Sequence, residues 1–238
     1  MYRDHTVSVY FPCRNEEAHL RQVVAQVPTF VDEIIVVSNR STDGTVELSK
    51  SLDLTVLVDD RTSGGIGYGY AHMTGMAACS GDLIVTSDAD GSYPVDQIHR
   101  PLDRLVDDGM DFVSCSRYPV PEGSTIPWAL RAGVRLLNTE TRLLFGRRVK
   151  DVLSGMWALR ATARPHLALD AGDWNLSPGI KVHALRSPAL RFAEVPIAQR
   201  PRLGQSHQRY LSTGFSHAGF LLRTRLGTYP GSPLDHDG

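Results

Sequence analysis

Hydrophobic and polar positions follow two periods along this chain. Short apolar runs, such as residues 33–38, are typical of strands that are buried on both faces. Between these runs, apolar side chains recur at helical spacing, as they do over residues 20–27 until Pro28 ends the pattern. The pattern predicts strands over residues 7–11, 33–38, 54–58, 82–87, 111–116 and 191–197, and helices over residues 16–27, 46–52, 130–144 and 211–222, with a further helix that ends near residue 80.

Strand and helix signals alternate through the first half of the chain. Repeated strand–helix units of this kind predict an α/β fold with a mostly parallel central sheet and helices on both faces. Residues 119–128 are rich in proline and glycine and predict a loop, and the polar residues 229–238 predict a disordered tail. We therefore expect one domain over residues 1–228.

The composition suits a globular domain with a substantial core. Apolar residues make up 42% of the chain, which argues against disorder. Lys plus Arg number 25 against 26 Asp plus Glu, so the formal net charge is −1 and no nucleic-acid partner is expected. The cysteines are Cys13, Cys79 and Cys115, and their spacing fits neither a disulfide framework nor a metal site.

Cysteine usage and hydropathy indicate where the chain works. A protein without a disulfide framework suits a reducing compartment. The N-terminal segment has no long apolar run and does not resemble a signal peptide, and no stretch has the roughly 18 apolar residues that cross a bilayer. The expected location is the cytoplasm.

The balanced net charge hides a segregation of charges. Acidic residues, most of them aspartates, concentrate in residues 82–111, whereas arginines concentrate in residues 181–227. An acidic centre and a basic C-terminal third are therefore compatible with a near-neutral total.

Paired aspartates follow the fourth predicted strand. Asp88 and Asp90 flank Ala89 in the run Ser-Asp-Ala-Asp-Gly, at the edge where open α/β sheets bind ligands. Two carboxylates there can share a divalent ion with substrate phosphates, an arrangement that Mg²⁺ favours. The alternative is an ordinary turn, because Asp and Gly are common turn residues, and the aspartate pair taken alone favours that alternative.

Two further signals are weaker. Gly64, Gly65, Gly67 and Gly69 precede a helical segment and are equally compatible with a ligand loop and a plain flexible loop. Arg117 follows the fifth predicted strand and could reach phosphate at the same edge, although a solvated surface arginine is the more common case. The histidines lack metal-ligand spacing, and no serine, cysteine or histidine stands in a nucleophile motif.

Segments between residue 7 and about residue 207 match, in order, motifs that occur together in one enzyme family. Residues 12–16 (Pro-Cys-Arg-Asn-Glu) match P-x-x-N-E, and residues 116–118 match S-R-Y. The other matching segments are residues 34–45, 67–71, 87–94, 151–156, 194–197 and 204–206. Taken together, they resemble family 2 glycosyltransferases with the GT-A fold, and within them the dolichol-phosphate mannosyltransferase-like branch of polyprenyl-phosphate glycosyltransferases.

The resemblance implies an inverting transfer from a nucleotide-sugar donor, a GDP- or UDP-sugar, with Mg²⁺ or Mn²⁺ held by Asp88 and Asp90. It implies that residues 1–118 bind the donor and residues 119–228 the acceptor. The implied catalytic residues are Asp90, Arg117 and Asp151. The implied donor site is Pro12, Arg14, Glu16, Ser38, Asn39, Asp43, Gly67, Asp88, Ala89 and Asp90. The implied acceptor and phosphate site is Arg117, Arg131, Ser154, Arg200, Arg202 and Ser206.

The chain departs from the family pattern at three places. Ser38 replaces the aspartate that commonly reads the base, which leaves the base of the donor open. Pro201 stands where the family has a phosphate-binding arginine, so either Arg200 or Arg202 is expected to substitute for it. The acidic residues that are common before the late strand are missing from residues 176–182.

The arginine-rich C-terminal third and the missing late acid favour a phosphate acceptor. An alcohol acceptor needs a general base, whereas a phosphate is already ionised and needs cations that offset its repulsion from the donor diphosphate. A polyprenyl phosphate is therefore expected, with its chain along the helices at residues 130–144 and 211–222. The last helix is a candidate for contact with the inner face of the membrane, and a plain cover for the sheet is the equally weighted alternative.

Other functions stay open on the sequence. A small soluble acceptor would need a base, for which Asp151 and Asp173 are the candidates. A sugar-nucleotide-binding protein without turnover is a second alternative, against which the intact aspartate pair argues. A nucleotidyltransferase would usually carry a glycine-rich loop after its first strand, where this chain has Pro-Cys-Arg-Asn-Glu-Glu. The sugar and the oligomeric state are not predicted.

Overall fold

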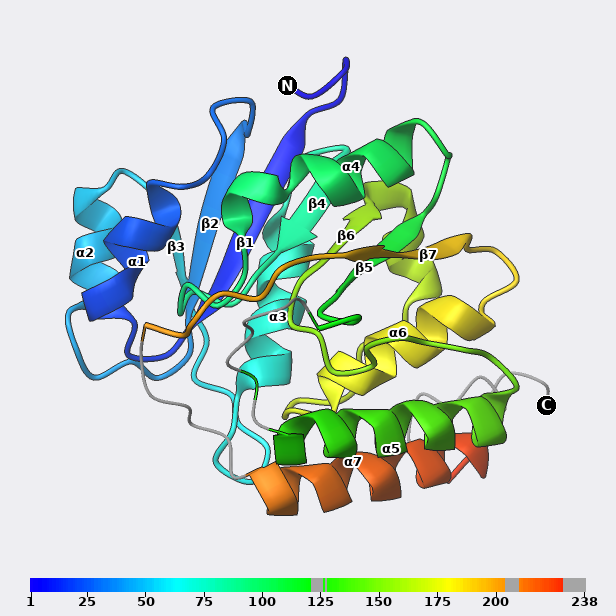
Figure 1. The fold of residues 1–238 in the computed structure, drawn as a ribbon. Helices are drawn as coiled ribbons and strands as arrows, with labels where there is room; N and C mark the ends of the chain where they lie inside the picture. The colour runs from blue at the N-terminus through cyan, green and yellow to red at the C-terminus, as the bar shows by residue number, and fades with distance from the viewer. Residues whose placement is uncertain (121–125, 127, 204–209, 229–238) are drawn as a thin grey trace.

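The computed structural model describes residues 1–120, 126, 128–203 and 210–228, and in this part of the chain one mixed sheet forms the centre of the molecule (Figure 1). The strand order is β3-β2-β1-β4-β6-β5-β7. All neighbouring strands run parallel except β6, which is antiparallel to both β4 and β5. The strands are β1 (Val7–Cys13), β2 (Glu33–Ser38), β3 (Thr55–Val58), β4 (Leu83–Thr86), β5 (Phe112–Ser116), β6 (Trp157–Arg160) and β7 (Phe192–Pro196).

Helices cover both faces of this sheet. Apolar side chains of α1 and α4 pack on one face, and those of α3 and α6 pack on the other. A further layer is formed by α5 and α7, which lie side by side beneath α6 at the bottom of Figure 1 and share an apolar cluster with it. The helices are α1 (Glu17–Val24), α2 (Thr45–Ser51), α3 (Tyr68–Ala78), α4 (His99–Val106), α5 (Trp128–Phe145), α6 (Leu176–Arg186) and α7 (Tyr210–Arg225), with short 3-10 helices η1 (Val95–Gln97) and η2 (Ala161–His166).

The central strand β1 is buried on both faces. Val9 and Phe11 pack with the α1 and α4 layer, whereas Tyr10 packs with the α3 and α6 layer. Helix α3 comes close to Tyr10 because it presents Gly75 there, and a Cβ at that position would lie 2.5 Å from the tyrosine ring. The period-2 alternation of the strand thus supplies both hydrophobic layers.

The predicted mostly parallel sheet with helices on both faces is confirmed. In the described part of the chain, the elements that were not predicted are α4, α6, β6 and the short 3-10 helices η1 and η2. Strand β6 has only four residues, and α6 is buried on all sides, so neither shows a clear period. Most of the predicted loop 119–128 and the whole predicted tail 229–238 lie outside the described residues.

The reversed direction of β6 decides what meets at one edge of the sheet. The parallel strands β1, β2, β4 and β5 all end at this edge. Because β6 runs the other way, the residues that precede it, 151–156, arrive at the same edge. Loops from distant parts of the sequence therefore converge where open α/β sheets bind ligands.

Candidate active site

A cavity of about 310 Å³ opens at this edge. It is lined by the ends of β1 and β4, by the start of α3, and by side chains from α6, α7 and residues 199–202. The implied site residues that line it are Pro12, Arg14, Glu16, Asn39, Gly67, Asp88, Ala89, Asp90, Arg117, Arg200 and Arg202. Ser38, Asp43, Arg131, Asp151 and Ser154 lie around it without lining it, and Ser206 lies outside the described residues.

Three carboxylates gather on one side of the cavity. Burial and the neighbouring Asp90 carboxylate raise the pKa of Asp88 to about 7, and the same two causes raise the pKa of Glu16 to about 7. Arg202 forms an ion pair with Asp90 and lowers this repulsion. A cluster of partly protonated carboxylates is electrostatically unfavourable and gains from an added cation.

The side chains of the cavity offer part of the coordination shell that a divalent metal ion needs. Among the described residues, no group of three or more His, Cys, Asp or Glu side chains is arranged to hold a metal alone. Asp88 and Asp90 supply two carboxylates at the cavity wall. This set fits Mg²⁺ or Mn²⁺ that completes its coordination with waters and substrate phosphates, which is the usual arrangement for Mg²⁺.

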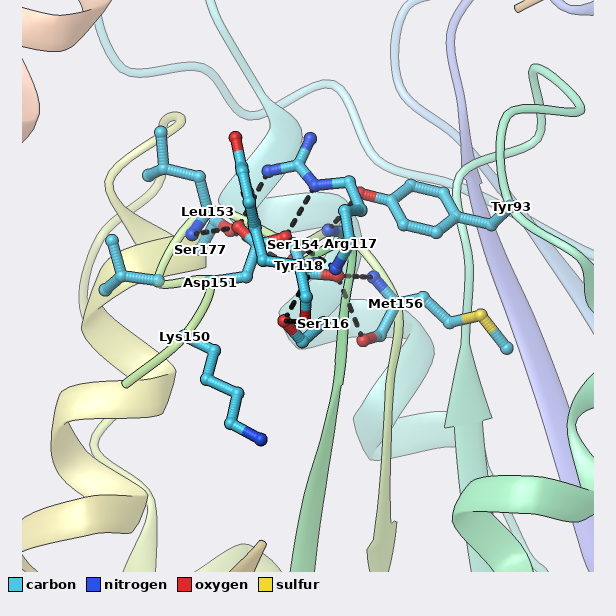
Figure 2. Close-up of polar contacts among 12 residues, drawn as sticks. Tyr93, Ser116, Arg117, Tyr118, Lys150, Asp151, Leu153, Ser154, Met156 and Ser177 are labelled. Atoms are coloured by element: carbon cyan, nitrogen blue, oxygen red, sulfur yellow. Dashed lines mark hydrogen bonds and ion pairs between the residues drawn. The ribbon is translucent and has the colours of Figure 1, made fainter. Parts of the chain in front are cut away.

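An ion pair between Arg117 and Asp151 lies on another side of the cavity (Figure 2). The Arg117 Nε and Nη2 atoms donate to Asp151 at 2.6 and 2.8 Å, and the Arg117 main-chain N–H donates to the same carboxylate at 3.0 Å. Burial opposes the charge of Arg117, but Asp151 outweighs it and raises the pKa of the guanidinium. Asp151 is fully buried, so it holds Arg117 at the cavity and does not itself face a ligand.

The segment before β6 is fixed at almost every residue. The buried Lys181 ammonium donates to the carbonyl of Ser154 at 2.6 Å and to the carbonyl and hydroxyl of Ser177 at 3.0 and 3.2 Å. The Gly155 N–H donates to the hydroxyl of Tyr93 at 2.6 Å. A Cβ on Gly155 would lie 2.6 Å from an Asp88 carboxylate oxygen, so only glycine leaves room for that carboxylate.

Asn39 shapes the side of the cavity next to the glycine-rich segment. Its amide donates to the carbonyls of Asp59 and Arg61 at 2.5 and 3.0 Å, and it lies against Gly67, where a Cβ would overlap it. Arg14 donates to the carbonyl of Gly65 at 3.2 Å. The glycine-rich segment is therefore part of the cavity wall.

Ser38 and Asp43 lie behind this wall. The Ser38 hydroxyl donates to Ser41 at 2.9 Å. Asp43 accepts hydrogen bonds from the main-chain N–H groups of Glu17 and Thr45, both at 3.1 Å, next to the first turns of α1 and α2. Both side chains position loops of the site.

The arginines implied for the acceptor lie in different settings. The Arg200 guanidinium donates to Asp96 at 2.9 Å and to Gln26 at 2.6 Å, and Arg200 lines the cavity as Arg202 does. Arg131 donates to the carbonyl of Ile126 at 2.9 Å and does not line the cavity.

Several residues at or below the cavity were not identified from the sequence. Tyr68, Trp174 and His217 line it, and Lys181 lies beneath it. Tyr68 follows the glycine run, and that position was the one available signal. The other three depend on the packing of α6 and α7, and α6 was not predicted.

The geometry agrees with the comparisons to known proteins. The model of the family described as Glycosyl transferase family 2 matches residues 8–166. The chain belongs to this family. It is 30% identical over 212 residues to a dolichyl-phosphate hexose transferase of Haloferax volcanii, covering 86% of this chain and 87% of the relative.

Another relative is longer than this chain. The low-salt glycan biosynthesis hexosyltransferase Agl6 of Haloferax volcanii is 27% identical over 224 residues, which cover 91% of this chain and 53% of the relative. The chain thus spans about half the length of that protein. The chain is an enzyme, a glycosyltransferase of family 2.

A solved structure supports the fold. Glucosyl-3-phosphoglycerate synthase of Mycobacterium tuberculosis, in a crystal with Mn²⁺, uridine diphosphate and phosphoglyceric acid, superposes with a TM-score of 0.74 at 23% identity and covers 95% of this chain and 80% of that one. The implied GT-A fold is confirmed by this likeness and by the sheet order.

We expect Asp88→Asn to raise the melting temperature at pH 8 and to leave it unchanged at pH 4. A carboxyl whose folded pKa is raised contributes stability that is present below its unfolded pKa and is lost as the pH rises through the folded pKa, here about 7. Asparagine removes that loss, and each kcal/mol corresponds to about 2–4 °C in a chain of this size.

The measurement is thermal unfolding in metal-free buffer at both pH values. Asp60→Asn, at an exposed position, is the matched control and should change neither value. A lower melting temperature of Asp88→Asn at pH 8 would contradict the repulsion between the carboxylates.

Proposed function

We propose that the chain transfers a sugar, with inversion, from a nucleoside-diphosphate sugar to a polyprenyl phosphate, with the help of Mg²⁺ or Mn²⁺. The observation that carries this proposal is a single cavity in which paired carboxylates face several arginines. Asp88, Asp90, Arg117, Arg200 and Arg202 all line it, and Arg202 is ion-paired with Asp90. Such a cavity suits two phosphate-bearing substrates and a cation between them.

Residues 1–118 form the donor half in this proposal. Pro12, Arg14, Glu16 and Asn39 line the part of the cavity next to the glycine-rich loop and hold the nucleoside of a GDP- or UDP-sugar. Ser38 and Asp43 support their loops. Glucosyl-3-phosphoglycerate synthase has a similar fold, and its crystal contains uridine diphosphate. This supports a nucleotide donor of the same class.

Asp88 and Asp90 are the residues that would hold the metal. A bound divalent ion supplies charge neutralisation on the diphosphate that leaves the sugar. The crystal of glucosyl-3-phosphoglycerate synthase with Mn²⁺ supports this choice. Gly155 keeps space for the Asp88 carboxylate, and Arg202, paired with Asp90, lies close enough to meet the same phosphates.

The acceptor half, residues 119–228, favours an ionised acceptor. Among the described residues, the carboxylates that line the cavity are Glu16, Asp88 and Asp90, all on the donor side. Without an acid beside the acceptor, a hydroxyl would have no carboxylate base, whereas a phosphate needs only cations. Arg117, held by Asp151, is placed to bind that phosphate. The relative named dolichyl-phosphate hexose transferase supports a lipid phosphate.

The outer surface of α5 and α7 supports a lipid acceptor. Trp128 and Leu143 on α5 are 81% and 79% exposed, and Leu211 and Phe215 on α7 are 83% and 79% exposed. Arginines at both helices, Arg135, Arg142, Arg223 and Arg225, add positive charge. No helix in the described part of the chain is long and apolar enough to cross a membrane. In this proposal the two helices lie on an anionic membrane surface.

A soluble acceptor is the second candidate. The crystal of glucosyl-3-phosphoglycerate synthase with phosphoglyceric acid favours it, because that acceptor also carries a phosphate. Of the two base candidates, Asp151 is occupied by Arg117, and Asp173 accepts hydrogen bonds from Asn175. A hydroxyl acceptor would therefore need a base other than these carboxylates.

Asp90→Ala is expected to reduce Mn²⁺-dependent release of nucleoside diphosphate by about 10²-fold or more, because the charge that holds the cation at the diphosphate is lost. The donor is first chosen from GDP-, UDP- and dTDP-sugars by the rise in melting temperature with Mg²⁺. Asp60→Ala is the control. If Asp90→Ala released nucleoside diphosphate as fast as the wild type, Asp90 would not be a metal ligand. If the wild type released none, the chain would be a binding protein without turnover.

With the donor chosen, the wild type is expected to form a lipid-linked sugar from a polyprenyl phosphate in detergent or vesicles, since the cavity offers cations without an acceptor-side acid. Thin-layer separation of labelled product measures the transfer. If the wild type glycosylated 3-phosphoglycerate but formed no lipid-linked product with any donor, the proposed lipid acceptor would be wrong and the acceptor would be soluble.

The membrane contact predicts that Leu211→Ser combined with Phe215→Ser reduces co-sedimentation with phosphatidylglycerol vesicles by roughly fivefold, because both exposed side chains lose apolar burial. Val58→Ser is the matched control, since Val58 is an apolar residue that is 61% exposed at the end of β3. If the wild type, the double variant and Val58→Ser sedimented equally with the vesicles, this surface would not be the membrane contact.

A further inference from the structure

A hydrogen-bonded chain of four side chains joins the N-terminal end of α6 to α7 at the cavity. The Asn175 amide nitrogen donates to the Asp173 carboxylate and to the Ser216 hydroxyl, both at 3.1 Å. On the other side, the Asn175 amide oxygen lies 2.9 Å from Nδ1 of His217. Asn175 is 5% exposed and His217 is 3% exposed, so the hydrogen bond between them is shielded from solvent, whereas Asp173 is half-buried and Ser216 is exposed.

This chain determines which nitrogen of His217 carries the proton. A carboxylate only accepts hydrogen bonds, so the Asn175 nitrogen must face Asp173 and its oxygen must face His217. Nδ1 of His217 therefore carries the hydrogen and donates it to Asn175. The remaining nitrogen, Nε2, keeps a lone pair and acts as an acceptor.

The surroundings keep the ring neutral. Burial, and then the nearby Lys181 ammonium, lower the pKa of His217 to about 4. At neutral pH the cavity wall at His217 thus offers a hydrogen-bond acceptor and no positive charge. An ionised phosphate needs donors, so this part of the wall does not suit the phosphates that Arg117 and Arg202 would meet.

Aromatic side chains line the same cavity as this acceptor. Trp174, between Asp173 and Asn175 in sequence, lines the cavity and packs on Tyr68 with ring centroids 4.5 Å apart. Tyr68 in turn packs on His72 at 4.4 Å. A wall of aromatic rings with a neutral acceptor matches a group that has both apolar C–H surface and hydroxyls.

We propose that His217 and Trp174 form a subsite for a neutral, hydroxyl-bearing group, in which a substrate hydroxyl donates to Nε2 of His217 beside the Trp174 ring. The inference rests on the proposed function, because it requires that a nucleotide sugar binds in this cavity. The hydroxyl belongs either to the transferred sugar or to an acceptor alcohol, and the two sources share this chemistry.

The test compares His217→Phe, which keeps a ring without an acceptor, with His217→Gln, whose amide oxygen can accept. His183→Phe is the matched control, because His183 is a buried imidazole on α6 that does not line the cavity and whose pKa is also lowered to about 4 by burial. Calorimetry with Mn²⁺ measures the affinity for UDP-glucose and UDP, and for GDP-mannose and GDP. Thermal unfolding checks each variant, and His217→Met replaces His217→Phe should the latter not fold.

If the hydroxyl is on the transferred sugar, His217→Phe weakens the nucleotide sugar about tenfold and leaves the nucleoside diphosphate unchanged, while His217→Gln retains most of the affinity. If it is on an acceptor, His217→Phe leaves both affinities unchanged and raises the KM for 3-phosphoglycerate about tenfold, with transfer to polyprenyl phosphate unaffected.

Two results overturn the subsite. One is that His217→Phe behaves as His183→Phe does in every measurement. The other is that UDP and UDP-glucose, or GDP and GDP-mannose, weaken equally, since His217 would then act on the nucleotide or on the fold. Failure of the wild type to bind any nucleotide sugar is separate, because it overturns the proposed function and the subsite together.

Discussion

The ion pair between Arg117 and Asp151 is the interaction on which the site depends. It ties the end of β5 to the segment before β6, and both partners are almost completely buried. Such a pair adds little net stability, but removal of one partner leaves an uncompensated buried charge at a cost of about 3–5 kcal/mol. The main effect of the ion pair is therefore to fix the positions of the residues around it. It holds the segment that places Gly155 against Asp88, and it keeps Arg117 at the cavity.

Charge is sorted along the cavity in a way that net charge does not reveal. Carboxylates lie after β1 and β4, guanidinium groups lie after β5 and at residues 200–202, and the wall at His217 is neutral. Lys181 connects these zones. Its ammonium donates to the Ser154 carbonyl, and its charge adds to the burial that lowers the pKa of His217. Burial lowers the pKa of Lys181 itself to about 7, so the fold accepts an unfavourable charge in order to fix this segment.

The sequence predicted most parts of the fold that have a local period, although it missed the amphipathic helix α4, and it predicted the site where motifs coincide with strand ends. β1, β2 and α1 follow from apolar spacing, and Asp88 and Asp90 from their place after β4. Helix α6 escaped prediction because side chains on all of its faces are buried, including Ser177, Lys181 and His183, so no polar face marks the period. The spacing of a motif also does not show in which direction its side chains point. Ser38 and Asp43 lie close to the cavity but turn to neighbouring loops, and His217 meets Asn175 only through tertiary packing.

The cavity has the polarity of an amphiphilic acceptor. Arginines line it together with apolar side chains, among them Leu130 of α5, Tyr210 of α7, and Ile126 and Leu153 in the segments before α5 and β6. Beyond them lie the exposed apolar residues of the same two helices. A phosphate at Arg117 would therefore leave its hydrocarbon chain running over an apolar path toward the outer surface, and burial of each methylene there contributes about 0.8 kcal/mol. A small polar acceptor would leave that path unused, which is the physical reason to favour a lipid phosphate over a soluble one.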